Sequence, residues 1–116
     1  MRYLMLVCVD PDHTTADVEA APSLDDWDKT IEANGEWVLG DRFRPTSEAR
    51  TVRVRAGELL VNDGPFTESK EWIAGFDVIE APDMDAAIAI AAGHPQAYGG
   101  RIEVRPFWPL GDSDRG

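Results

Sequence analysis

The chain has 116 residues, one cysteine and a formal charge of −11, with 22 acidic against 11 basic side chains. This length fits one domain, the negative charge disfavours nucleic-acid binding, a single cysteine cannot form an internal disulfide, and no apolar run approaches the roughly 18 residues of a membrane span. Because no signal-peptide pattern follows the first residues, we expect a soluble, cytoplasmic protein that binds neither nucleic acid nor membrane.

The predicted elements begin with a strand over residues 4–9, which are six apolar residues in a row. The run has no polar face, so we expect it to be covered on both sides. A helix follows over residues 24–34, because Ser23 is a good N-cap, Gly35 is a natural stop, and apolar residues recur at helical spacing.

The middle of the chain is predicted to form strands. Residues 36–43 form one strand, and the strict apolar–polar alternation of residues 51–55 indicates another. An Ala-Gly turn leads into residues 58–61, the return strand of a hairpin. The sequence Asn-Asp-Gly-Pro at 62–65 ends this strand, since Asp-Gly favours a turn and proline cannot extend a central strand.

The last part of the chain repeats the pattern of strand, helix and strand. Residues 72–80 are predicted to form a strand, and Asp83 is the expected N-cap of a helix over residues 84–93. The alternating residues 101–105 indicate a final strand. Residues 109–116 are expected to form a loose tail.

The order β-α-β-hairpin-β-α-β matches an α+β, ferredoxin-like sandwich with an inserted hairpin, in which helices cover one face of an antiparallel sheet. We assign it to a single domain over residues 1–108. The first strand would then leave its second apolar face in water, and an exposed patch of that kind is large for a monomer. We therefore expect a homodimer in which a second copy packs sheet against sheet.

Charge is unevenly distributed along the chain. Residues 10–28 contain seven acids and no lysine or arginine, whereas residues 42–55 contain five arginines and one acid. One interpretation is two solvated surfaces of opposite sign that face each other within the fold or across a dimer. The other is an anion-binding patch of arginines.

Two titratable residues are candidates for catalysis, Asp63 and His94. Asp63 lies in the predicted turn, where it either serves as a base or ligand-orienting carboxylate or stabilises the turn through its own backbone. His94 follows the second predicted helix. It either transfers protons near neutral pH or interacts with the negative end of the helix dipole.

A ligand pocket is predicted near the same turn. Its expected residues are Trp37, Asp63, Phe66, Lys70 and Trp72. The aromatic residues either line a pocket between the sheet and a partner subunit or fill the core and interface. Lys70 either lies at the mouth of a cleft or belongs to a solvated set of ion pairs.

No metal or other cofactor is expected. Asp10, Asp12 and His13 are of metal-binding types, but they share one loop without a fixed coordination frame. Cys8 lies in the apolar first strand and is interpreted as a buried, inert thiol. The sequence contains no Ser-His-Asp signature, phosphate-binding loop or dinucleotide fingerprint.

One stretch carries a family resemblance. Residues 63–71, which read Asp-Gly-Pro-Phe-Thr-Glu-Ser-Lys-Glu and are followed by Gly75 and Phe76, resemble the signature of the DGPF-motif branch of the YCII-related family. Four further blocks are similar to the family pattern: residues 1–6, 51–55, 83–86 and 102–106. The resemblance covers residues 1 to about 108.

This resemblance implies a ferredoxin-like subunit of the dimeric α/β-barrel type. Broader YCII-related members are thought to carry a His–Asp pair in a cleft, with the histidine at the start of the first helix and the aspartate directly before a proline. Here the first helix starts without histidine, and His94 stands before the proline, so the pair does not carry over. The DGPF branch also often accompanies extracytoplasmic-function sigma factors.

Three functions therefore stand as hypotheses. The first is a homodimeric small-molecule-binding or accessory protein. The second is a small enzyme of the dimeric-barrel type in which Asp63 and His94 transfer protons. The third is an interaction module associated with sigma-factor regulation. The sequence leaves open whether the protein is an enzyme.

Overall fold

The computed structural model describes residues 1–64 and 72–111. Its elements in chain order are β1 (Arg2–Val9), α1 (Thr15–Glu19), α2 (Leu24–Ala33), β2 (Trp37–Arg42), the 3-10 helix η1 (Thr46–Glu48), β3 (Arg50–Arg55), β4 (Glu58–Asp63), β5 (Trp72–Glu80), α3 (Met84–Ala92), α4 (Gln96–Gly99) and β6 (Gly100–Pro106).

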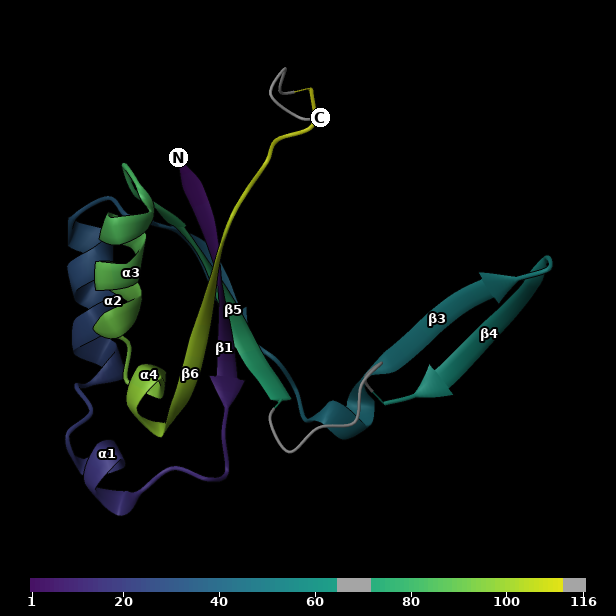
Figure 1. Ribbon diagram of the computed structural model, residues 1–116, viewed down its shortest axis with the longest axis horizontal. Coiled ribbons are helices and arrows are strands. Elements are labelled where there is room, and N and C mark those ends of the chain that lie inside the picture. Colours follow the sequence, from purple (N-terminus) through teal and green to yellow (C-terminus); the bar gives the residue numbers. More distant parts are fainter. Residues whose placement is uncertain (65–71, 112–116) are drawn as a thin grey trace.

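Four strands form the main sheet, in the order β2-β5-β1-β6, and each neighbouring pair is antiparallel. Helices α2 and α3 lie on one face of this sheet (Figure 1). The fold is therefore α+β and compatible with the predicted ferredoxin-like sandwich. Strands β3 and β4 form a separate two-stranded sheet, which projects to the other side of the main sheet.

Local sequence signals explain where the two main helices begin. The Ser23 hydroxyl accepts the backbone N–H of Asp26 at 3.4 Å, and the Asp83 carboxylate accepts that of Ala86 at 2.8 Å, so both predicted N-caps are confirmed. Gly35 follows α2 with a φ of 69°, a left-handed conformation that favours glycine.

The structure adds two short helices to the predicted order. Helix α1 begins after Thr14, whose hydroxyl accepts the backbone N–H of Asp17, while the Asp17 carboxylate accepts that of Thr14. This reciprocal capping box lies within the acidic residues 10–28, for which no helix before residue 24 is predicted from the sequence. Helix α4 follows Pro95, whose fixed φ suits the start of a helix.

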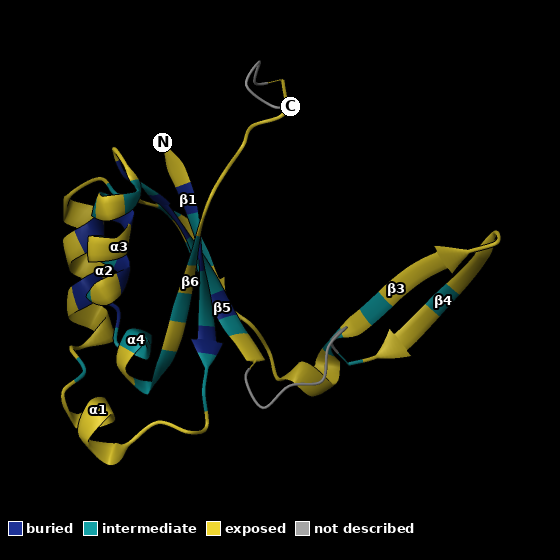
Figure 2. Cartoon of the chain, viewed as in Figure 1, coloured by how far each residue is buried: buried dark blue, intermediate teal, exposed yellow. Residues whose placement is uncertain are grey.

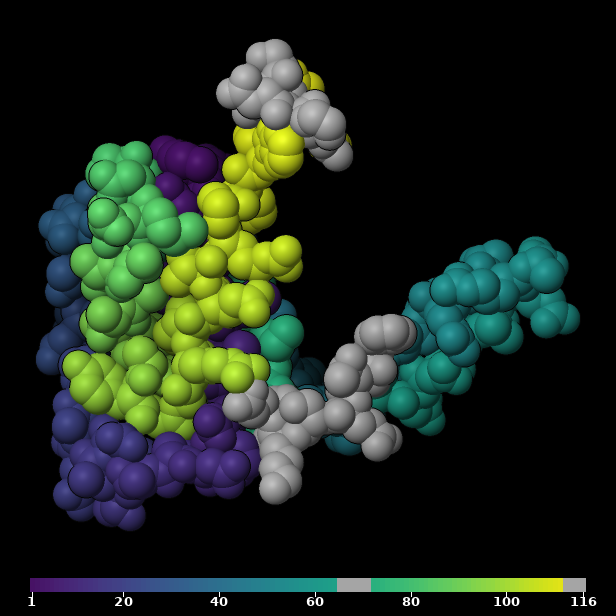
Figure 3. Space-filling view, viewed as in Figure 1, coloured from purple at the N-terminus to yellow at the C-terminus, as the bar shows by residue number. Residues whose placement is uncertain are grey.

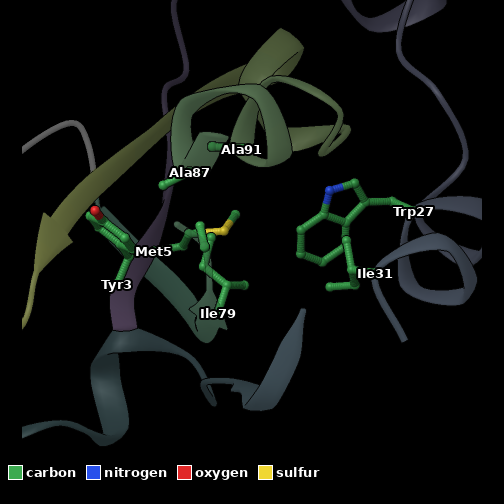
Figure 4. Close-up of a cluster of buried hydrophobic side chains, with 8 residues drawn as sticks. Tyr3, Met5, Trp27, Ile31, Ile79, Ala87 and Ala91 are labelled. Carbon is green, nitrogen blue, oxygen red and sulfur yellow. The ribbon is translucent and has the colours of Figure 1, made fainter. Parts of the chain in front are cut away.

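The core lies between the main sheet and the two helices α2 and α3. Tyr3, Met5 and Ile79 from the sheet are almost completely buried, and Trp27 of α2 packs with them (Figures 2 and 4). The Trp27 indole N–H donates to the Ile90 carbonyl oxygen at 2.8 Å, which ties α2 to α3. On α3, the buried side chains are alanines, and small side chains allow a helix to lie close to a sheet.

Among the described residues, no helix lies on the opposite face of the main sheet (Figure 1). Side chains alternate along a strand, so Leu4 and Leu6 point away from the core that holds their neighbours on β1. They pair with Val78 and Phe76 of β5, and both leucines are only partly buried. Leu39 of β2 lies at 48% exposure. We call this surface the open sheet face.

Some of the residues named in the sequence predictions lie outside the described residues. This applies to Phe66 and Lys70, to the part of the predicted signature over residues 65–71, and to residues 112–116 of the expected tail. In residues 1–64 and 72–111, no helix is long and apolar enough to cross a membrane.

Candidate functional site

The main sheet and the helices α1 to α4 form what we call the body. A cavity of about 640 Å³ lies on the body where α2, β2 and β5 meet the chain that follows α3. Small-molecule sites commonly enclose roughly 300–1,000 Å³, so the cavity is large enough for an organic ligand. Its described lining residues are Val7, Leu24, Asp28, Glu32, Trp37, Gly40, Asp41, Arg42, Ala74, Gly75, Phe76, Asp77, His94 and Gln96. Four of them are carboxylates and one is an arginine, which makes the wall acidic.

Asp77 is the acid in this wall that burial perturbs most. It lies in β5 at a position that faces the helices, and the Trp37 indole N–H donates to its Oδ1 at 3.1 Å. Burial raises the pKa of Asp77 to about 6, the Trp37 hydrogen bond opposes this rise, and the nearby Asp28 adds to it. Asp77 can therefore gain or lose a proton close to neutral pH.

A glycine on the neighbouring strand leaves the space that Asp77 occupies. Gly40 pairs with Asp77 across β2 and β5. A Cβ atom at position 40 would collide with Asp77 Oδ1 and would lie 2.7 Å from the Phe76 carbonyl oxygen. Glycine is thus the residue that permits this carboxylate to turn into the cavity beside Trp37.

His94 also lines the cavity, and its surroundings define its protonation. The side chain is buried, and its Nδ1 accepts the backbone N–H of Gln96 at 3.0 Å. A neutral ring with Nδ1 as acceptor carries its proton on Nε2. The His94 ring meets the Trp27 ring edge-on, with centroids 4.7 Å apart. Burial lowers the pKa of His94 to about 4, so the ring is neutral at pH 7.

This neutral state separates the two interpretations of His94. A stabilising interaction with the negative end of the α3 dipole requires a positively charged imidazolium. The lowered pKa removes that charge at neutral pH. His94 is therefore available as a hydrogen-bonding group in the cavity wall rather than as a cationic helix cap.

The other acids reinforce the negative character of the cavity. Burial, together with Asp25 and Glu32, raises the pKa of Asp28, because nearby negative charges disfavour another one. Arg42 is the basic residue among the described lining residues. A ligand group that donates hydrogen bonds or carries positive charge would relieve this repulsion.

Of the residues predicted for the site, Trp37 and His94 are brought together in this cavity. Asp63 lies at the end of β4, where its Oδ1 pairs with the Arg50 Nε at 3.1 Å and the side chain is 88% exposed. It is not among the described lining residues of the cavity. Trp72 lines a second hollow of about 620 Å³ at the end of β2, which adjoins the cavity through Asp41, Arg42 and Ala74.

Asp77 and Gly40 were not predicted from the sequence. The available signal is an acid between Phe76 and Val78 in a strand that is otherwise mostly apolar. An acid at such a position either faces water or marks a buried polar site. The register places Asp77 on the same side of β5 as the buried Ile79, which selects the buried site.

The residues of possible metal-binding type have local roles. Asp10 Oδ1 accepts the backbone N–H of Asp12 at 2.8 Å, and the Asp10 carbonyl oxygen lies 2.7 Å from His13 Nδ1. Within the described part of the chain, no group of three or more His, Cys, Asp or Glu residues has a metal-binding arrangement. Cys8 is free and buried, which confirms its predicted burial.

An α+β domain with an acidic cavity beside its helices and sheet is thus the class of protein that fold and site define. The YCII-related domain matches residues 1–111, so the chain belongs to that family. It is also 43% identical over 68 residues to an uncharacterized protein of Rhizobium meliloti (strain 1021), R00369. That similarity spans 57% of this chain and 55% of the relative's length.

Proposed function

We propose that this YCII-related protein is a homodimer that binds a small organic molecule through a hydrogen-bond-donating or cationic group at Asp77. The observation that carries this proposal is a carboxylate with a pKa raised to about 6 in a cavity of about 640 Å³. Perturbed acids in well-formed cavities are typical of binding and catalytic sites. Trp37 orients one Asp77 oxygen, and a ligand donor would occupy the other.

The homodimer rests on the open sheet face. Leu4, Leu6 and Leu39 place apolar surface on the side of the sheet that lacks helices. A second copy with the same face would remove this surface from water in a symmetric, self-complementary contact. Size-exclusion chromatography with light scattering should give twice the 12.8 kDa mass of one chain at micromolar concentration. A monomer at that concentration would contradict the dimer.

Ligand binding is best tested by thermal unfolding in the presence of a compound panel. The panel contains small primary amines, alcohols, ketones and carboxylic acids, and the protein is studied at pH 8, where Asp77 is ionised. A ligand that binds only the native state raises the melting temperature. We expect amines to raise it and carboxylic acids to leave it unchanged.

Two variants make this test specific. Asp77→Asn keeps the shape of the side chain and removes its charge, so it should abolish the shift caused by amines. Asp85→Asn removes an exposed acid from the first turn of α3 and should leave the shift intact. A flat panel, or an amine shift that survives Asp77→Asn, would contradict the proposed site.

Proton transfer is a second candidate function. A carboxyl group with a pKa of about 6 is suited to general acid–base chemistry near neutral pH, and neutral His94 lines the same cavity. In this form of the enzyme hypothesis, Asp77 takes the place of Asp63 beside His94. Any panel compound that binds should be followed by NMR for turnover. Turnover should depend on a group with a pKa near 6 and should be lost in Asp77→Asn.

A further inference from the structure

The two-stranded hairpin of β3 and β4, residues 50–63, stands apart from the rest of the protein; we call it the arm. It extends from the side of the main sheet that carries no helices (Figures 1 and 3). The radius of gyration is 16.6 Å, whereas a compact domain of this length is expected to have about 13 Å. The projecting arm contributes to this excess over a compact domain.

One face of the arm is apolar and exposed. Val52 pairs with Val61, and Val54 pairs with Leu59, so all four side chains lie on one face. Their exposed fractions are between 53% and 67%. An isolated two-stranded hairpin is marginally stable in water, and it usually needs a covering surface. The described residues of the same chain supply none.

Apart from Leu60, the other face and the base of the arm are polar. Arg53 and Arg55 lie on the face opposite the valines, and Arg50 pairs with Asp63 at the base. Together with Arg42 and Arg44 they concentrate positive charge near the arm of a chain whose net charge is −11. The acidic residues 10–28 lie around α1 and α2, on the far side of the body (Figure 1). The opposite charges therefore do not face each other within one chain.

We propose that the arm packs its apolar face against the body of a second copy of the same chain. This inference rests on the proposed homodimer and names an additional contact in it. A second copy on the open sheet face lies on the side toward which the arm projects, so one partner can cover both surfaces. A second copy carries the same net charge of −11, which over long range attracts the five arginines of residues 42–55, although Arg53 and Arg55 lie on the face away from the contact. In a symmetric pair, each arm holds the other subunit.

Sedimentation velocity over a concentration series tests this contact. The variant V52T/V54T/L59T/V61T makes the apolar face polar and places β-branched threonines, which favour strands, at all four positions. The control L60T/N62T also places threonines on β4, but on the opposite face, and it keeps every arginine of the arm. We expect the first variant to raise the dimer dissociation constant at least about tenfold and the control to change it less than about threefold.

A second experiment places a photo-cross-linker in the otherwise unchanged protein. With Leu59→p-benzoylphenylalanine, irradiation should join two chains into a species of double mass, and mass spectrometry should locate the link on the partner's body. The same probe in place of Arg53 should react less. This result does not depend on whether the four-threonine variant retains its hairpin.

The outcomes distinguish the proposed contact of the arm from the proposed homodimer. A dimer that neither weakens in V52T/V54T/L59T/V61T nor cross-links through position 59 would overturn the arm contact and leave the homodimer standing. A wild-type protein that is monomeric at micromolar concentration would overturn both.

Discussion

The body and the arm are built from the same kinds of residue, but they bury them differently. In the body, Tyr3, Met5 and Ile79 are closed in by two helices and reach 2% exposure or less. In the arm, Val54 and Leu59 face outward at 59% and 67% exposure. The alternating pattern of a strand therefore shows which residues share a face, and it does not show whether the same chain covers that face.

The largest loss of stability should come from removing a core side chain of the body. Ile79→Ala removes a fully buried side chain from the core and should lower the free energy of unfolding by about 2–5 kcal/mol at every protein concentration. Leu59→Ala in the arm should act through association, so its smaller effect should depend on concentration. Urea unfolding at two concentrations measures both. Equal losses for the two variants would remove the distinction between body and arm.

A smaller loss of stability is expected from a substitution at Gly40, which lines the ligand cavity beside Asp77. Gly40→Ala places a methyl group against Asp77 and the Phe76 carbonyl oxygen, and the shift should destabilise the fold by about 1–3 kcal/mol. Gly99→Ala is the control, because its nearest contact would be an ordinary 3.5 Å from Val18. Amine-dependent melting shifts should also shrink in Gly40→Ala. A stable variant with full ligand response would show that Gly40 does not position Asp77.

The pH dependence of the body should contain two opposing contributions. The pKa of Asp77 rises from 3.8 to about 6 on folding, so its stabilising contribution is complete below pH 3.8 and is lost as pH rises through 6. The pKa of His94 falls from 6.5 to about 4, so its contribution is complete above pH 6.5 and is lost as pH falls through 4. Between about pH 4 and 6 the two slopes oppose each other.

Asp77→Asn should remove the contribution of Asp77 and leave the pH dependence that His94 causes. Relative to wild type, the variant should gain about 1–2 kcal/mol at pH 7.5 and nothing at pH 4, since it removes a buried charge at the higher pH. His94→Gln should instead gain stability at acidic pH. Urea unfolding at pH 4, 5, 6 and 7.5 gives the slopes. A pH-independent difference between Asp77→Asn and wild type would show that Asp77 does not titrate in this range.

The sequence was informative for the body because its signals are local. Caps at Ser23 and Asp83 and the alternation within strands predicted the main elements to within a few residues. The capping box of Thr14 and Asp17 was an equally local signal, but it introduces a helix of five residues with no buried side chain. Helices that short contribute little periodicity, so the pattern alone did not indicate α1.

The site was less accessible to sequence reasoning because it depends on register across strands. Trp37, Asp77 and His94 come from three separate parts of the chain and meet in one cavity. Asp63, which the motif made conspicuous, lies on the arm and pairs with Arg50. A motif marks residues that are adjacent in sequence, whereas a cavity collects residues whose side chains face the same side of neighbouring strands.

Hydrogen–deuterium exchange of the wild-type protein is the most direct test of the difference between body and arm. If a second copy covers the arm, exchange over residues 50–63 should slow as protein concentration rises across the dimer dissociation constant, while exchange in α2 and α3 should stay constant. Exchange in the arm that is equally fast at low and high concentration would contradict the proposed cover.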